Sequence, residues 1–170
     1  MNLDSMKDIL AAVRREEKPI WEIIIETDME NRGVTREDSM AKMAQAWHAM
    51  LDASDSYNGK RHSASGLVGG QGEQMRSYAA SGDPISGSFA AEVFTEALCM
   101  GESNACMRRV VAAPTAGACG VMPAVLIPLY RRDNIPEERM LEAMFVASGI
   151  GAVIAYRACI AGASGGCQAE

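Results

Sequence analysis

Two glycine-rich segments, each with one cysteine, hold the residues best suited to chemistry. Residues 114–123 read PTAGACGVMP around Cys119, and residues 162–170 read GASGGCQAE around Cys167. Glycine beside a thiol lets the backbone adopt positive φ angles and lets a bulky partner approach closely. A packed core needs neither property, whereas a pocket for an inorganic cluster or a small substrate needs both. We interpret the two thiols as ligands or reactive groups; the alternative is that both are small buried side chains.

A third glycine-rich segment covers residues 54–88, and within it residues 60–70 read KRHSASGLVGG. Its cations, hydroxyls and backbone N–H groups together suit a carboxylate, although a solvated basic turn would look the same. We expect this loop to lie on the same side of the protein as Cys119. The candidate substrate-binding residues are hydroxyl and glycine residues of these loops: Ser63, Ser65, Gly66, Gly69, Gly70 and Thr115.

Several common sites are excluded by spacing. No Cys-x-x-Cys pair or zinc-type histidine pair is present, so the structural zinc patterns fail. The glycines of residues 66–72 lack the Lys-Ser/Thr ending of a phosphate loop, and no strand pattern precedes them. No lysine stands in an apolar motif that would suggest pyridoxal phosphate. A metal cluster on cysteine thiolates is the remaining natural source of an electrophile.

Composition sets the broad class of protein. With 170 residues, 48% of them hydrophobic, the chain is long enough for one globular domain, and we expect residues 1–170 to form it. The net charge of −6 argues against a nucleic-acid surface. The most membrane-like segment, residues 143–160, is interrupted by Gly149, Gly151 and Arg157, so no membrane span is expected. Five cysteines without a secretory signal indicate a reducing, cytoplasmic setting.

The elements that must position these loops are predicted to be helices. Apolar residues recur three and four apart through most of the chain, which predicts an all-α, multi-helical domain with glycine-rich active-site loops. The β-branched run at 20–25 leaves a strand open as an alternative there. Thr35 and Asp38 resemble a capping box, with Asp in place of the usual Glu or Gln. The helices are expected at residues 3–17, 20–31, 36–51, 73–80, 89–100, after 107, from 123, and 140–160, the last being buried on all sides.

Three motifs together bring a family into view. Residues 65–70 (SGLVGG), 114–123 and 162–170 resemble, in order and along essentially the whole chain, the signatures of the bacterial iron–sulfur L-serine dehydratases, α subunit or catalytic domain. The resemblance implies an all-helical catalytic domain with an oxygen-sensitive 4Fe-4S cluster. It also implies deamination of L-serine to pyruvate and ammonia without pyridoxal phosphate, a reaction of amino-acid degradation and gluconeogenesis.

By this resemblance Cys119 and Cys167 are two of three thiolate ligands, and the third is expected beyond Glu170. The resemblance also implies a β subunit as partner and an oligomeric enzyme, while the base that takes the α-proton is not identified. Two residues depart from the family pattern, Gln71 and Ser164, where acids are common. We expect a catalytic domain that is incomplete at its C-terminus and inactive alone. The alternatives are a cysteine desulfidase-like cluster lyase and a non-catalytic cluster-binding module.

Overall fold

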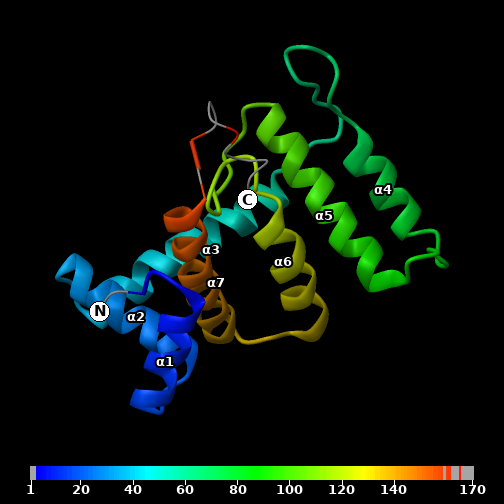
Figure 1. The fold of residues 1–170 in the computed structure, drawn as a ribbon. Coiled ribbons are helices and arrows are strands. Elements are labelled where there is room, and N and C mark those ends of the chain that lie inside the picture. The colour runs from blue at the N-terminus through cyan, green and yellow to red at the C-terminus, as the bar shows by residue number, and fades with distance from the viewer. Residues whose placement is uncertain (1–2, 159, 162–164, 166–170) are drawn as a thin grey trace. The chain divides into compact units, whose positions relative to one another are not determined.

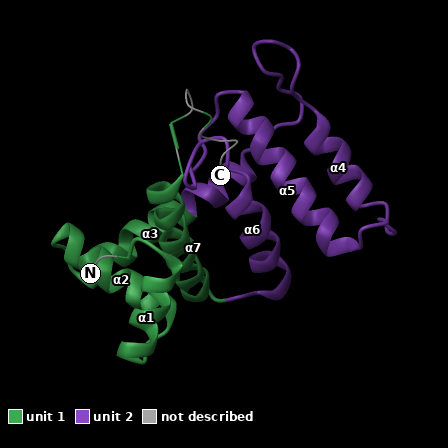
Figure 2. Cartoon of the chain, in the orientation of Figure 1, with its two compact units in different colours: residues 1–47, 136–170 green, residues 48–135 purple. Residues whose placement is uncertain are grey.

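A computed structural model describes residues 3–158, 160–161 and 165 of the chain. It confirms the all-α prediction, because the described residues form helices and loops without a strand (Figure 1). The helices are α1 (Met6–Glu16), α2 (Ile20–Arg32), α3 (Arg36–Asp55), α4 (Gln71–Ala79), α5 (Ser88–Ala105), α6 (Val121–Asp133) and α7 (Glu137–Arg157). They form two compact units, Met1–Trp47 with Pro136–Glu170 and His48–Ile135, and the boundary falls within α3 (Figure 2).

The first unit is built around the packing of α2 against α7. Its core contains Ile9, Ile24, Ile25, Phe145 and Val153. The helices approach closely at Gly149, where a Cβ atom would lie only 2.5 Å from Ile24 Cδ1. The β-branched run at 20–25 is therefore helical, and its strand alternative is wrong because these side chains fill a helix–helix interface.

Local signals at the ends of α2 and α3 work as predicted. Gly33 ends α2 with a φ of +64°, and its N–H donates to the Met29 carbonyl. Thr35 and Asp38 form a reciprocal capping box: the Thr35 N–H donates to Asp38 Oδ2 at 3.1 Å, and the Asp38 N–H donates to Thr35 Oγ1 at 3.1 Å. Aspartate therefore completes the capping box here in place of the usual Glu or Gln.

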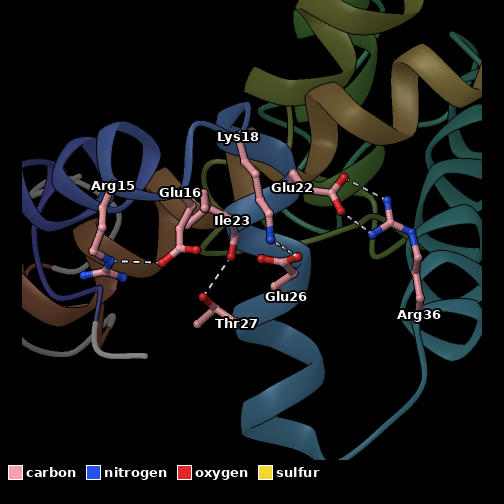
Figure 3. Close-up of polar contacts among 8 residues, drawn as sticks. All are labelled: Arg15, Glu16, Lys18, Glu22, Ile23, Glu26, Thr27 and Arg36. Carbon is pink, nitrogen blue, oxygen red and sulfur yellow. Dashed lines mark hydrogen bonds and ion pairs between the residues drawn. The ribbon is translucent and has the colours of Figure 1, made fainter.

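Two ion pairs join residues of α2 to neighbouring segments, as Figure 3 shows. Arg36 binds the Glu22 carboxylate through its two terminal guanidinium nitrogens at 2.6 and 2.9 Å. This hydrogen bonding lowers the pKa of the Glu22 carboxyl. Lys18 Nζ lies 2.6 Å from Glu26 Oε1. Such partly exposed pairs contribute little to stability.

Helix α7 departs from its prediction of burial on all sides. Phe145, Gly149 and Val153 are buried, but Tyr156 is 68% exposed and Ile150 is 39% exposed. The helix is therefore buried on one side and exposed on the other, although its composition is mostly apolar. By length and composition alone it could cross a membrane. One such helix among the described residues is weak evidence, since core helices of soluble proteins pass the same test.

The second unit places α5 between α4 and α6, both of which it contacts. Helix α5 continues through Gly101 to Ala105, beyond its predicted end near residue 100. The helix predicted after Met107 is not formed, because Met107 adopts a left-handed φ of +57°. The Arg108 N–H then donates to the Ser103 carbonyl at 2.8 Å, a Schellman ending that turns the chain into a loop. That loop leads to α6, which contains Pro128 without ending there.

Candidate functional site

The C-terminal part of α5 holds the loop that carries Cys119. The Cys119 thiol points at the Met100 carbonyl, with 4.0 Å between sulfur and oxygen. Asn104 Nδ2, one turn further along α5, donates to the Ala116 carbonyl at 3.0 Å. Thr115 contributes inside the loop, where its Oγ1 accepts the Ala118 N–H at 3.3 Å. The loop is thus hydrogen-bonded to α5 through Asn104 and packs against it through Cys119.

The same part of α5 holds the end of the 65–70 loop through Glu102. This carboxylate is only 5% exposed. Its Oε1 accepts the backbone N–H groups of Gln71 at 2.6 Å and Gly72 at 3.2 Å. Its Oε2 accepts the Tyr57 hydroxyl at 2.5 Å. The last two turns of α5 therefore bring the two motif loops to the same end of the unit, through Met100, Glu102 and Asn104.

Sequence reasoning missed Glu102 and Tyr57. The available signal was indirect: α4 begins after Gly70, which has no side chain to cap the helix. A helix start without a local cap needs an acceptor from elsewhere in the fold. The sequence does not say which of the chain's 22 acidic residues supplies it.

The predicted carboxylate cradle is a loop that largely satisfies its own polar groups. Ser63 Oγ accepts the Val68 N–H at 3.2 Å, and Ser65 Oγ accepts the Leu67 N–H at 3.4 Å. The two hydroxyl oxygens lie 3.1 Å apart. Among the amides of residues 66–72, that of Gly70 is without an acceptor in the described part of the chain. The loop therefore offers hydroxyls and one amide, rather than a row of free N–H groups.

The loop also closes tightly on its own first residues. A Cβ atom at Gly69, where φ is +151°, would lie 2.5 Å from the Arg61 carbonyl oxygen and 2.9 Å from the His62 ring. Gln71, the residue that departs from the family pattern, accepts the Gly69 N–H on its Oε1 at 3.1 Å. Gly69 and Gln71 thus hold the end of the loop against its first residues. The glycine at position 69 is therefore explained by this close packing, with no need for a bound ligand.

Cys119 is enclosed in this structure. Its side chain is 1% exposed and packs in a cluster with Ala53 and Met100, against Val110. Burial raises the pKa of this thiol, which favours the neutral form. Among the described residues no group of three or more His, Cys, Asp or Glu side chains could hold a metal ion. By themselves these residues do not fit a 4Fe-4S cluster; Cys167, Ser164 and the predicted meeting of the two cysteine loops lie outside the described residues.

A second buried thiol lies beside Glu102. Arg76 Nη2 donates to Cys99 Sγ at 3.6 Å, and its guanidinium carbon lies 5.1 Å from the centre of the Tyr57 ring. Burial raises the pKa of Cys99 to about 11, so the thiol is neutral at pH 7. A hollow of about 10 Å³ between Tyr57, Glu102 and Cys106 has room for roughly one water and not for an amino acid.

The fold and the loops define an all-helical protein with two glycine-rich motif loops held on one helix, and comparison with known proteins gives the family. The family model described as serine dehydratase alpha chain matches residues 15–170. The chain therefore belongs to the serine dehydratase alpha-chain family, as its motifs indicated.

Curated relatives agree along nearly the whole chain. A probable L-serine dehydratase alpha chain of Bacillus subtilis (strain 168) is 32% identical over 166 residues, which cover 98% of this chain and 55% of the relative. The L-serine dehydratase alpha chain of Peptoniphilus asaccharolyticus is 31% identical over 99% of this chain and 58% of its own length. The L-serine dehydratase of Helicobacter pylori (strain ATCC 700392 / 26695) is 30% identical over 99% of this chain and 38% of its own length.

The chain thus spans a little over half the length of the Bacillus subtilis and Peptoniphilus asaccharolyticus alpha chains. No solved structure matches it significantly.

Proposed function

We propose that this chain supplies the loop-bearing part of an L-serine dehydratase, acting with a β chain as a cytoplasmic oligomer. One observation carries the proposal: α5 fixes both motif loops, one through Glu102 and one through Met100 and Asn104. The relatives named above as L-serine dehydratases support the substrate. Two loops held at one end of a rigid helix keep fixed positions relative to each other, which suits a reaction between a bound substrate and an electrophile.

In the proposed reaction L-serine loses its α-proton to a base and its β-hydroxyl leaves as water. The resulting aminoacrylate tautomerises to an imine, which water hydrolyses to pyruvate and ammonia. We assign the substrate carboxylate to the 65–70 loop, where the Ser63 and Ser65 hydroxyls and the Gly70 N–H are the available donors. Thr115 supports the neighbouring loop. The residue that takes the α-proton stays unassigned.

The proposed cofactor is the family's 4Fe-4S cluster rather than pyridoxal phosphate, with Cys119 and Cys167 as two ligands. Such a cluster supplies a Lewis acid when bound. Because Cys119 is enclosed by Ala53 and Met100, its ligand role requires an arrangement of this loop different from the one described.

The test is anaerobic iron–sulfur reconstitution of the chain together with its β partner, followed by a coupled assay for pyruvate. We expect serine-dependent pyruvate from the pair and none from the 170-residue chain alone. Sulfide release from cysteine without pyruvate from serine would favour the desulfidase alternative. Iron binding without either product would favour a non-catalytic module.

Matched cysteine variants test the ligand assignment. Cys119→Ser should lower both iron per chain and pyruvate formation, whereas Cys106→Ser, which changes a half-buried thiol at the end of α5, should leave both unchanged. Full iron content in the Cys119 variant would remove it from the ligand set.

A further inference from the structure

We propose that Glu102 is the positioning residue of the 65–70 loop, acting as a clamp across the base of that loop. Its carboxylate receives Tyr57 from one side and Gln71 and Gly72 from the other. Tyr57 precedes residues 58–70, which contain the 65–70 loop, and Gln71 follows them directly. One buried carboxylate therefore joins the two ends of residues 58–70. The proposal rests on the proposed function for the identity of the loop's ligand, but not for the clamp itself.

An acceptor at position 102 compensates for what α4 lacks at its first turn. The first amides of a helix have no acceptor within the helix, and a side chain at the N-cap usually supplies one. Gly70 occupies the N-cap of α4 and makes no side-chain cap. Glu102 takes the amides of both Gln71 and Gly72, and its negative charge is favourable at the positive end of the α4 dipole.

Tyr57 completes the clamp, because its hydroxyl donates a hydrogen bond to Glu102 Oε2. Burial and the hydrogen bond to Glu102 raise the pKa of the Tyr57 phenol, so it stays protonated at any pH the enzyme meets. Gly72 keeps this arrangement compact, since a Cβ atom there would lie 2.7 Å from the Tyr57 hydroxyl oxygen. A glutamine at position 102 has a single, uncharged acceptor oxygen. It can keep the two amides only by turning its NH2 group toward the Tyr57 hydroxyl oxygen, and it loses the charge that strengthens these hydrogen bonds.

Placement on α5 makes the clamp separable from the Cys119 loop. Residues 116 and 119 are held by Asn104 and Met100, two positions to either side of Glu102. A change at Glu102 therefore releases the 65–70 loop while those two contacts remain. Loss of the clamp should weaken substrate binding without loss of the neighbouring loop's contacts, which is the signature of a positioning residue.

The experiment compares Glu102→Gln with Tyr57→Phe and with the control Glu73→Gln, an exposed carboxyl on α4 that pairs with Arg76. In the α–β complex, Glu102→Gln should raise the KM for serine by about tenfold or more, with a smaller change in kcat and unchanged iron per chain. Tyr57→Phe should raise the KM by roughly two- to fivefold, because the two amide bonds survive. Glu73→Gln should match the wild type.

Hydrogen exchange of the chain tests the clamp without any assay of activity. Exchange at the amides of Gln71 and Gly72 should accelerate by at least about tenfold in Glu102→Gln and stay slow in Glu73→Gln. If Glu102→Gln does not fold, Tyr57→Phe answers the same question, with a smaller acceleration expected at both amides. Unchanged exchange at both amides overturns the clamp.

An active complex with unchanged KM, or with iron lost in parallel with activity, overturns the positioning role. If no complex makes pyruvate from serine, the proposed function fails while the exchange result still decides the clamp.

Discussion

Gly72 lies directly against Cys99: a Cβ atom built on Gly72 would sit 2.8 Å from the Cys99 sulfur. The two residues belong to α4 and α5, which follow each other in the chain and pack together. Because the backbone of α4 contacts a side chain of α5 here, packing restricts the position of the first turn of α4 against α5. The same turn receives Glu102, so packing and hydrogen bonding fix it together.

Gly72→Ala should therefore destabilise the second unit. Neither the buried sulfur nor the Tyr57 hydroxyl can move away cheaply, and overpacking of this kind costs about 1–3 kcal/mol. Urea unfolding measures the change. Gly101→Ala, inside α5 with no atom within 4 Å of the added Cβ, is the matched control and should be neutral or stabilising by up to about 1 kcal/mol. Equal effects of both substitutions would contradict the close approach at Gly72.

Met107→Gly should stabilise the protein by roughly 0.5–1 kcal/mol. Met107 has a φ of +57°, which costs an L-residue energy that glycine does not pay. Its side chain is 90% exposed, so little buried surface is lost. Thermal unfolding measures the gain. Met107→Ala, which keeps the strain and removes the same side chain, should show no gain; if it does, the side chain rather than the backbone is responsible.

Thiol alkylation of the native chain should distinguish two cysteines at the end of α5. Cys106 is half-buried, whereas Cys99 is 1% exposed and has a pKa of about 11. We expect iodoacetamide to modify Cys106 well before Cys99 near pH 8, because the thiolate is the nucleophile. Peptide mapping by mass spectrometry separates the two sites, and both should react in denaturant. Faster native modification of Cys99 would contradict its enclosure.

Glu96→Gln should make stability less sensitive to pH. Glu96 is 7% exposed, its Oε1 has no partner among the described residues, and burial raises the pKa of its carboxyl. The folded state therefore holds this proton more tightly than the unfolded state, so stability falls as pH rises from the unfolded pKa through the folded one. The variant should gain about 1 kcal/mol over wild type near pH 8 and little near pH 4.

Urea midpoints across this range measure the effect of Glu96→Gln. Glu92→Gln, an exposed carboxyl on the same helix, is the control and should follow the wild-type curve. A gain that does not grow with pH would mean that the Glu96 proton plays no part.

Ser65→Ala tests the assignment of the substrate carboxylate. The Ser65 hydroxyl lies beside that of Ser63 on the exposed side of the loop. In the α–β complex its loss should raise the KM for serine by about 5–50-fold, the loss of a hydrogen bond to a charged group, with iron content unchanged. Loss of iron with normal turnover per cluster would instead indicate a structural role for Ser65.

Local sequence signals determined much of the fold. Three-four apolar spacing predicted the helices because that period places one face in a core, whatever the partner. The Thr35–Asp38 box and the glycine at position 33 act within one turn, so they could be recognised without knowledge of the rest of the chain. The glycine-rich loops and Cys119 were recognised by residue type, and the family followed from their order.

Only the tertiary structure decided what those loops are attached to. Glu102 bonds to Gln71 across 31 positions and to Tyr57 across 45, and no local period records such a pairing. The exposed face of α7 has the same origin, because the segments that pack against that helix decide which of its apolar residues are buried. Helix period and capping depend on a residue's neighbours within about four positions, whereas burial and buried hydrogen bonds depend on which distant segments pack against it.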